Sequence, residues 1–214
     1  MWDGKEGVNM NILLYALIVF LSYLLGCSNM ALYLSKLKGV DMRSGGSKNL
    51  GASNALVLMG WRFGVLVGIH DIGKAVLAVV LARHFAGELP GIAAAAGVAC
   101  VLGHIFPFYL RFKGGKGFAS YLGVTLALNW KFALIVLLIV ALVTYISDYI
   151  VVGTVTTVIL VPAYMGFTGS LLLSAILSLA TLAILFKHRE NFLRIYQGTE
   201  IGLRRAHRGD DRKL

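Results

Sequence analysis

The chain has 214 residues, of which 58% are hydrophobic and only 14% are charged. Soluble domains carry about 25% charged residues, so this composition excludes an ordinary water-soluble protein. A net charge of +10 would suggest nucleic acid as the partner of a soluble protein. Here the basic residues are concentrated in residues 36–48, 111–116 and 187–213, between apolar stretches. They therefore indicate the cytoplasmic side of a membrane protein, with no nucleic-acid partner.

The apolar stretches predict seven membrane-spanning helices, because a helix needs about 20 apolar residues to cross a bilayer. The predicted spans are residues 10–34, 63–83, 91–110, 118–130, 131–146, 150–167 and 170–186. Placing all three basic clusters in the cytoplasm requires an N-terminus outside and a C-terminus inside. The fourth span is short, so five or six spans are the alternatives.

The predicted fold class is all-α, a polytopic transmembrane helical bundle, because backbone polar groups in lipid must be satisfied within each segment. No domain boundary or internal repeat divides it. We expect one membrane-embedded domain over residues 1–203 and a charged cytoplasmic tail over residues 204–214. Cys27 and Cys100 lie in apolar stretches, which predicts buried thiols and neither a disulfide framework nor a zinc site.

The loop between the first two spans is rich in glycine, serine and cations, and residues 41–54 read DMRSGGSKNLGASN. Glycines let backbone N–H groups turn inward as an anion-binding nest, which hydroxyls, amides and cations can complete. A helix that starts near residues 53 and 54 would add the positive end of its dipole. The candidate phosphate ligands are Arg43, Ser47, Lys48, Asn49, Ser53 and Asn54. The alternative is that glycine and serine simply form a loop.

A second glycine-lysine loop follows the third span. Residues 112–117 read FKGGKG, with Lys113 and Lys116 around paired glycines, and lead into the next helix. The spacing is not that of a nucleotide-binding P-loop, and no βαβ unit surrounds it. Positive-inside bias accounts for the lysines but not for the glycines. Two such loops on one side of the membrane therefore favour phosphate binding.

Ionisable residues inside the spans are costly and are functional candidates by default. His104 stands near the cytoplasmic end of the third span, just before the helix-breaking Pro107; a structural hydrogen-bonding role is the alternative. Asp71 and Lys74 are three residues apart and share a helix face. This spacing predicts a structural ion pair in preference to substrate contact, with His70 as a third polar group beside it.

The last span ends in a charged segment that contains His188 and Asn191. On a continuing helix these two residues, three apart, face the same way and place a titratable group and an amide at the interface. The alternative is that the charged segment only anchors the span. No spacing of histidines and carboxylates indicates a metal site.

Taken in this order, the motifs resemble the bacterial acyl-phosphate:glycerol-3-phosphate acyltransferase family, the membrane enzymes that begin phospholipid synthesis. The resemblance runs from about Leu24 to Glu200. Its most specific parts are GHIFP at residues 103–107, FKGGKGFAS at residues 112–120 and HREN at residues 188–191. The first loop is a good but imperfect match.

The resemblance implies a seven-span fold without a metal or nucleotide cofactor. It implies transfer of a fatty acyl group from acyl-phosphate to glycerol-3-phosphate, which makes lysophosphatidic acid. The setting would be the lipids of a bacterial inner (cytoplasmic) membrane, with the active site facing the cytoplasm. The implied catalytic residues are His188 and Asn191, which position or polarise the acceptor hydroxyl without a covalent nucleophile. The implied substrate contacts beyond the first loop are His104, Lys113, Lys116, Ser120 and Ser147.

The chain departs from the family pattern at several positions. Val57 stands where an arginine is expected, and Ile150 where a second serine is expected. Losing one charged hydrogen bond to phosphate costs about 1.5–3 kcal/mol, and Lys48, in place of a glycine, is hypothesised to compensate. The remaining departures are Ser53 for threonine, Ala75 for glycine and Asp148 for an apolar residue.

The competing function is a transporter or flippase for a phosphorylated lipid or metabolite. The same loops would bind the phosphate, and Asp71, Lys74 and His104 would suit a polar path through the membrane. Against this alternative, the sequence shows no inverted repeat of broken helices of the kind many transporters have. A purely structural membrane scaffold, the third alternative, leaves the glycine loops unexplained.

Overall fold

The computed structural model describes residues 4–204, and every regular element within them is helical. The all-α class predicted from the sequence is therefore confirmed. Of the predicted tail, only Arg204 falls among the described residues. Six helices in the described range are long and apolar enough to cross a membrane, and one shorter apolar helix accompanies them.

The first predicted span consists of two helices, α1 (Gly4–Cys27) and α2 (Met30–Lys38). The predicted span is confirmed as a candidate span over Val8–Lys38, and it is divided at Asn29. The Asn29 side chain accepts a hydrogen bond from the Leu32 N–H at 2.8 Å and so caps the start of α2. Gly39, in the left-handed conformation at φ 64°, ends α2. The break leaves the carbonyls of Gly26 and Ser28 available to the ammonium of Lys74.

Two helices follow the first loop. α3 (Ala52–Met59) is short, and α4 (Trp61–Ala86) crosses the bundle. Gly60, at φ 94°, separates them, since this left-handed conformation suits glycine and interrupts a helix. α4 therefore begins at Trp61, two residues before the predicted span of residues 63–83, and ends three residues after it.

The remainder of the described chain, after α4, contains six helical elements. They are α5 (Ile92–Ile105), the 3-10 helix η1 (Phe108–Leu110), α6 (Phe118–Leu128), α7 (Trp130–Ser147), α8 (Ile150–Phe167) and, last, α9 (Leu171–Tyr196). α6 has 11 residues, so it extends for about 16 Å, half of the hydrocarbon thickness. Arg83 of α4 donates hydrogen bonds to the carbonyls of Ala127 and Leu128 at 2.6 and 3.3 Å. These bonds satisfy the end of the short helix.

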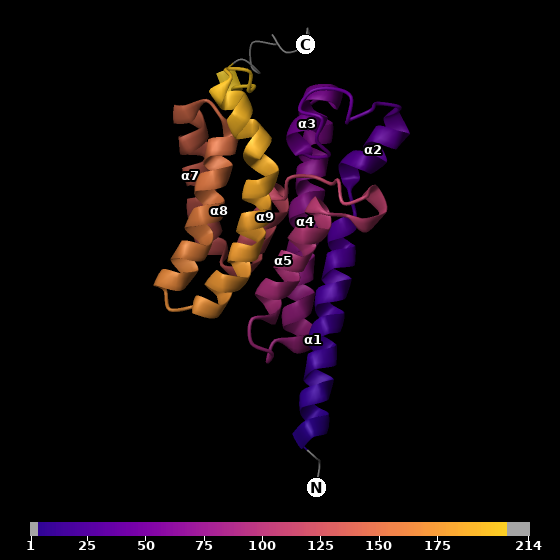
Figure 1. Ribbon diagram of the computed structural model, residues 1–214, viewed down its shortest axis with the longest axis vertical. Coiled ribbons are helices and arrows are strands. Elements are labelled where there is room, and N and C mark those ends of the chain that lie inside the picture. Colours follow the sequence, from indigo (N-terminus) through magenta and orange to yellow (C-terminus); the bar gives the residue numbers. More distant parts are fainter. Residues whose placement is uncertain (1–3, 205–214) are drawn as a thin grey trace.

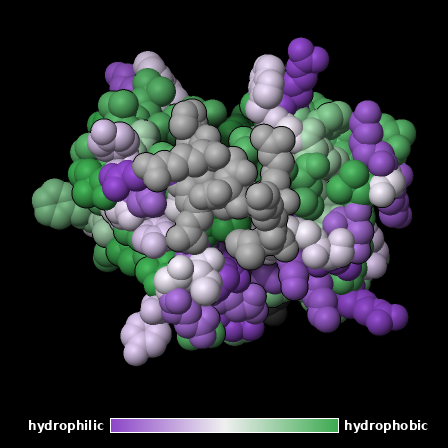
Figure 2. All heavy atoms as spheres, turned by 90° about the horizontal axis from the view of Figure 1, so that it is seen from above, coloured by the Kyte–Doolittle hydropathy of each residue, from purple (hydrophilic) through white to green (hydrophobic). Residues whose placement is uncertain are grey.

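The helices form two groups that face each other (Figure 1). α1 to α5 make up one group and α7 to α9 the other, while α6 contacts α4 and α5 on one side and α7 and α8 on the other. α2, α3 and the end of α9 lie at one end, and α1 starts at the opposite end. Seen from the end with α2 and α3, hydrophilic and hydrophobic residues are interspersed around the rim of the face (Figure 2). Which end faces the cytoplasm stays a prediction.

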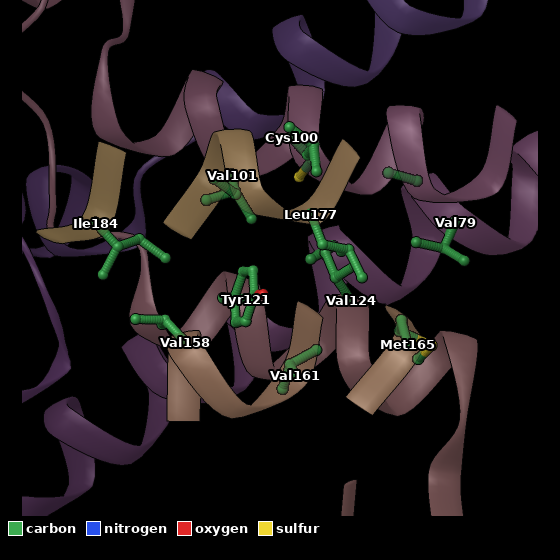
Figure 3. Close-up of a cluster of buried hydrophobic side chains, with 14 of the residues drawn as sticks. Val79, Cys100, Val101, Tyr121, Val124, Val158, Val161, Met165, Leu177 and Ile184 are labelled. Carbon is green, nitrogen blue, oxygen red and sulfur yellow. The ribbon is translucent and has the colours of Figure 1, made fainter. Parts of the chain in front are cut away.

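The largest hydrophobic core lies between the two groups. Tyr121 of α6 is fully buried there, near Val101 and Leu177 on one side and Val158 and Val161 on the other (Figure 3). Its hydroxyl lies 3.4 Å from the Thr181 hydroxyl of α9. This cluster joins α6 to α5, α8 and α9, so it holds the short helix in the middle of the bundle.

Glycines bring α1 against α5. A Cβ atom at Gly26 would overlap the carbonyl of Cys100, and one at Gly103 would overlap the carbonyl of Tyr23. Small residues allow this close backbone approach between membrane helices. Cys27 and Cys100 are both buried free thiols.

Candidate functional site

The first loop is organised by Asn54 of α3, whose side chain is 1% exposed. Its Oδ1 accepts a hydrogen bond from the Ser47 N–H at 2.9 Å, and its Nδ2 donates to the carbonyls of Met42 at 2.7 Å and Asn49 at 3.0 Å. Gly46 is left-handed at φ 55°, and a Cβ there would collide with Asn54. The Asn54 amide is thus engaged with the loop itself, where it fixes the positions of Ser47 and Asn49.

The second loop folds back onto the end of α5. The N–H groups of Gly114 and Gly115 donate to the carbonyls of Ile105 at 3.0 Å and His104 at 3.1 Å. A Cβ at Gly115 would overlap the His104 ring. The paired glycines therefore allow close packing on α5, and the expectation that their N–H groups form an anion-binding nest was wrong. The N–H groups that a helix start leaves unpaired belong to the first turn of α6, which begins at Phe118.

Lys116, at the end of this loop, reaches α9. Its Nζ donates to the Oδ1 of Asn191 at 2.7 Å. The Nδ2 of Asn191 donates to Glu200 Oε1 at 2.6 Å, and Arg194 Nε donates to Glu200 Oε2 at 2.6 Å. Burial, together with the nearby Arg194 charge, lowers the pKa of Lys116 to about 8. The half-buried ammonium therefore titrates close to physiological pH.

His188 lies one turn before Asn191 on α9 and is buried. Its Nδ1 is 2.8 Å from the carbonyl oxygen of Ile184, and a carbonyl can only accept, so Nδ1 carries the proton. In a neutral ring the other nitrogen, Nε2, is then a hydrogen-bond acceptor. This is the arrangement that a general base requires.

Asp71 and Lys74 form a buried ion pair at 3.1 Å. Lys74 Nζ also donates to the carbonyls of Gly26 at 3.0 Å and Ser28 at 2.6 Å, at the break between α1 and α2. His104 completes the cluster, with Nδ1 2.9 Å from Lys74 Nζ and 3.3 Å from Asp71 Oδ1. Three helices thus meet at one charge cluster, and His104 belongs to it. His104 is 30 positions from Lys74 in the chain, so sequence spacing did not predict this contact.

One cavity of about 430 Å³ lies between the two helix groups and is bordered by both loops. The sequence-predicted residues that line it are Ser47, Asn49, Ser53, Asp71, His104, Lys116, His188 and Asn191. A cavity of this size suits a small molecule, with few polar groups placed in a largely apolar wall. The structure thus brings together the predicted catalytic pair, one lysine and part of the first loop.

The other predicted residues lie outside the cavity lining. Arg43 donates to the Lys113 carbonyl at 2.8 Å and joins the two loops at the surface. Lys48 is exposed, with a left-handed φ of 55°. Ser147 donates to the Val143 carbonyl at 2.6 Å in its own helix, and the buried Ser120 hydroxyl has no partner within residues 4–204.

The sequence did not indicate that several of the lining residues belong to the site. Glu200 matched the family but was not assigned to the site, and Thr144 and Thr154 are small polar residues in otherwise apolar spans. Val57 and Ile150, the two departures from the family pattern, both line the cavity. Val57 of α3 and Ile150 of α8 border the same cavity because of how the helices pack, and no local sequence signal indicates this.

Comparison with known proteins identifies the family. The model of the family described as "Glycerol-3-phosphate acyltransferase" matches residues 16–198. This chain belongs to that family. Among relatives, the glycerol-3-phosphate acyltransferase of Bradyrhizobium diazoefficiens is 38% identical over 183 residues, which cover 84% of this chain and 90% of the relative. That of Geotalea daltonii is 38% identical over 182 residues, covering 84% and 92%.

The fold is also that of a solved family member. The crystal structure of PlsY, an integral membrane glycerol 3-phosphate acyltransferase, in its glycerol 3-phosphate form aligns with a TM-score of 0.83 and 32% identity. The alignment covers 88% of this chain and 95% of PlsY. The lysophosphatidic acid form gives a TM-score of 0.78 and 31% identity. The chain is therefore an integral membrane protein of the acyltransferase family.

Proposed function

We propose that this chain is a membrane enzyme that transfers a fatty acyl group from acyl-phosphate to glycerol-3-phosphate and makes lysophosphatidic acid for phospholipid synthesis. Its family supports the reaction, and the crystal forms of PlsY support the acceptor and the product. Acyl-phosphate as the donor is part of the proposal. The observation that carries it is the meeting of Lys116, His188 and Asn191 in one cavity.

Lys116 binds a substrate phosphate. Its ammonium is directed across the cavity to Asn191, and the cavity wall continues into Gly117, Phe118 and Ala119 at the start of α6. The first N–H groups of a helix are unpaired and carry the positive end of its dipole, so they favour an anion. A cation and a helix N-terminus together stabilise the charge that develops on a leaving phosphate.

His188 accepts the proton of the acceptor hydroxyl through Nε2 while Nδ1–H stays on the Ile184 carbonyl. The hydroxyl oxygen attacks the acyl carbonyl, the carbon–oxygen bond to phosphate breaks, and the ester forms. The proton passes from His188 to the leaving group, which departs as hydrogen phosphate. The reaction balances without a covalent enzyme intermediate. Holding both substrates in one cavity supplies an entropic advantage.

The acyl chain occupies the apolar part of the cavity. The apolar lining residues include Leu122 of α6, Val151 of α8 and Leu203. Apolar surface of this kind binds a hydrocarbon chain through the hydrophobic effect. The two classes of lining residue thus match the two ends of an acyl-phosphate.

The chain acts as one membrane-embedded domain over residues 1–203 with a charged tail, in a bacterial inner (cytoplasmic) membrane. We place the two loops and the end of α9 in the cytoplasm. The basic residues Lys36, Lys113 and Lys187 support this orientation by the positive-inside rule.

The direct test uses purified protein in detergent or lipid with acyl-phosphate and glycerol-3-phosphate. We expect release of inorganic phosphate and formation of lysophosphatidic acid in equal amounts, and loss of both in His188→Ala. A folded wild-type protein that forms no product contradicts the proposal. Counterflow of labelled glycerol-3-phosphate in proteoliposomes without any covalent product would instead support the transporter.

A further inference from the structure

One wall of the cavity is formed by the chain after α9. α9 ends at Tyr196, and Glu200, Ile201, Gly202 and Leu203 all line the cavity. We name residues 199–204 the strap. The strap forms part of the cavity wall, so its position contributes to the shape of the site.

The near end of the strap is attached to α9. The N–H groups of Thr199 and Glu200 donate to the Arg194 carbonyl at 2.8 and 3.1 Å. The Glu200 carboxylate then accepts hydrogen bonds from Asn191 and Arg194, each at 2.6 Å. Glu200 thereby fixes the Asn191 amide so that its oxygen faces Lys116.

The far end of the strap is attached to the turn between α7 and α8. Asp148 accepts the Leu203 N–H at 2.7 Å through its carbonyl and the Arg204 N–H at 2.8 Å through Oδ1. Gly202 packs on the same carboxylate, where a Cβ would come within 2.8 Å of its carbon. The Arg204 guanidinium lies 3.9 Å from Asp148.

Asp148 itself does not line the cavity. It adopts a left-handed backbone at φ 70°, in which aspartate, asparagine and glycine are tolerated better than other residues. This conformation ends α7 and turns both the carbonyl and the carboxylate toward the strap. The Asp148 side chain thus reaches the cavity through the strap.

We propose that Asp148 is a positioning residue of the active site: it holds the strap at the cavity, so that Glu200 stays on Asn191 and the Asn191 oxygen stays on Lys116. The proposal rests on the proposed function for the role of the cavity, whereas the contacts of the strap do not depend on that function. A carboxylate at this position is a departure from the apolar residue that the family pattern leads one to expect.

Release of the strap has a specific electrostatic consequence. The charged or titratable groups around Lys116 in the described chain are Lys187, His188, Glu190, Arg194 and Glu200. Glu200 favours the protonated form of Lys116, while Arg194 and Lys187 oppose it. Removing Glu200 from the site therefore lowers the pKa of Lys116 further. A change that only unfolds part of the protein population reduces activity equally at all pH values and shifts no pKa.

The test compares Asp148→Gly with Asp148→Asn. Both residues suit the left-handed backbone, but only asparagine keeps an oxygen that can accept the Arg204 N–H. We expect Asp148→Gly to raise KM for glycerol-3-phosphate about fivefold, the equivalent of one lost hydrogen bond, and to shift the alkaline limb of the pH profile to lower pH. Asp148→Asn should keep both values near those of the wild type. Equal behaviour of the two variants overturns the proposal.

A second measurement reports on the strap without enzyme activity. Ile201→Cys places a thiol on the cavity side of the strap, and the native Cys27 and Cys100 are buried. Maleimide should label Cys at this position faster in the Asp148→Gly background than in the Asp148→Asn background. If wild-type protein makes no product, the proposed function fails, while this labelling still decides the proposal on Asp148. Equal labelling rates in the two backgrounds contradict it.

Discussion

Lys116 donates a hydrogen bond of 2.7 Å to Asn191 across the cavity, and the two residues are 75 positions apart in the chain. This contact joins the second glycine-lysine loop to the end of α9. It gives the ammonium a defined direction before any substrate binds. Preorganised charge of this kind stabilises a transition state without reorganisation during the reaction.

The pKa of Lys116, lowered by burial to about 8, predicts a loss of substrate affinity at alkaline pH. Phosphate needs the protonated ammonium, so affinity is full below about pH 8 and falls as pH rises through the pKa. We expect KM for acyl-phosphate to rise above that pH, since Lys116 is proposed to hold the phosphate that leaves. Lys116→Arg, which stays charged, should remove this alkaline limb. Lys36→Ala, at an exposed lysine of α2, serves as the control and should keep the limb.

Removing the charge of Lys116 should reduce kcat/KM by about 10- to 100-fold, the range of a lost charged hydrogen bond to phosphate. Lys116→Met keeps most of the side-chain length, so packing against α9 changes little. The comparison variant is Lys113→Met, at the exposed lysine outside the cavity lining. Steady-state kinetics on both variants checks the assignment. A larger effect at Lys113 than at Lys116 would show that the other lysine binds the phosphate.

Adding an arginine at Val57 should strengthen phosphate binding. Val57 lines the cavity and is 41% exposed, so a longer side chain can enter without displacing the core. We expect Val57→Arg to lower KM for glycerol-3-phosphate about tenfold, in line with one gained charged hydrogen bond. Val57→Met controls for side-chain bulk. An equal change in KM for both variants would rule out a charge effect.

Asp71 and Lys74 should stabilise the fold only when both residues are present. Lys74→Met leaves the Asp71 carboxylate buried without this partner, so we expect a loss of about 3–5 kcal/mol of unfolding free energy. The double variant Asp71→Asn with Lys74→Met should recover part of that loss, since the uncompensated charge is gone. Thermal unfolding in detergent measures both. If the loss of unfolding free energy in the double variant equals the sum of the losses in Lys74→Met and Asp71→Asn, the two residues act independently.

Asn54 should be required for the first loop to keep its shape. Asn54→Ala removes three hydrogen bonds of a buried amide and should cost about 2–4 kcal/mol, because the freed backbone groups lose their partners. Ser44→Ala, at an exposed residue of the same loop, is the control. Thermal unfolding and KM should both change in the first variant only. An unchanged melting temperature in Asn54→Ala would refute this role.

The long apolar runs predicted the helices, because each segment in lipid must make its backbone hydrogen bonds within itself. The breaks were harder to place. The sequence did not reveal that Asn29 starts a new helix or that Gly60 separates α3 from α4, since asparagine and glycine also occur within spans. α6 was recognised as short, but its support by Arg83 depends on a neighbouring helix.

The sequence predicted the candidate site only where residues close together in the chain act together. His188 and Asn191 share a helix face by their spacing, and that expectation needs no tertiary information. By contrast, the paired glycines of the second loop were expected to bind an anion, whereas they pack on α5. Close packing and anion binding both favour glycine, so composition cannot tell them apart.

The sequence by itself determined that this protein is an all-helical membrane protein, and its motifs indicated the acyltransferase family. Hydrophobic length and local spacing are properties of the chain, so they can be read along it. Only the tertiary structure decided that Lys116 meets Asn191, that His104 joins Asp71 and Lys74, and that Asp148 holds the strap at Leu203. Each of these contacts joins segments far apart in the chain, and their directions depend on how the helices pack.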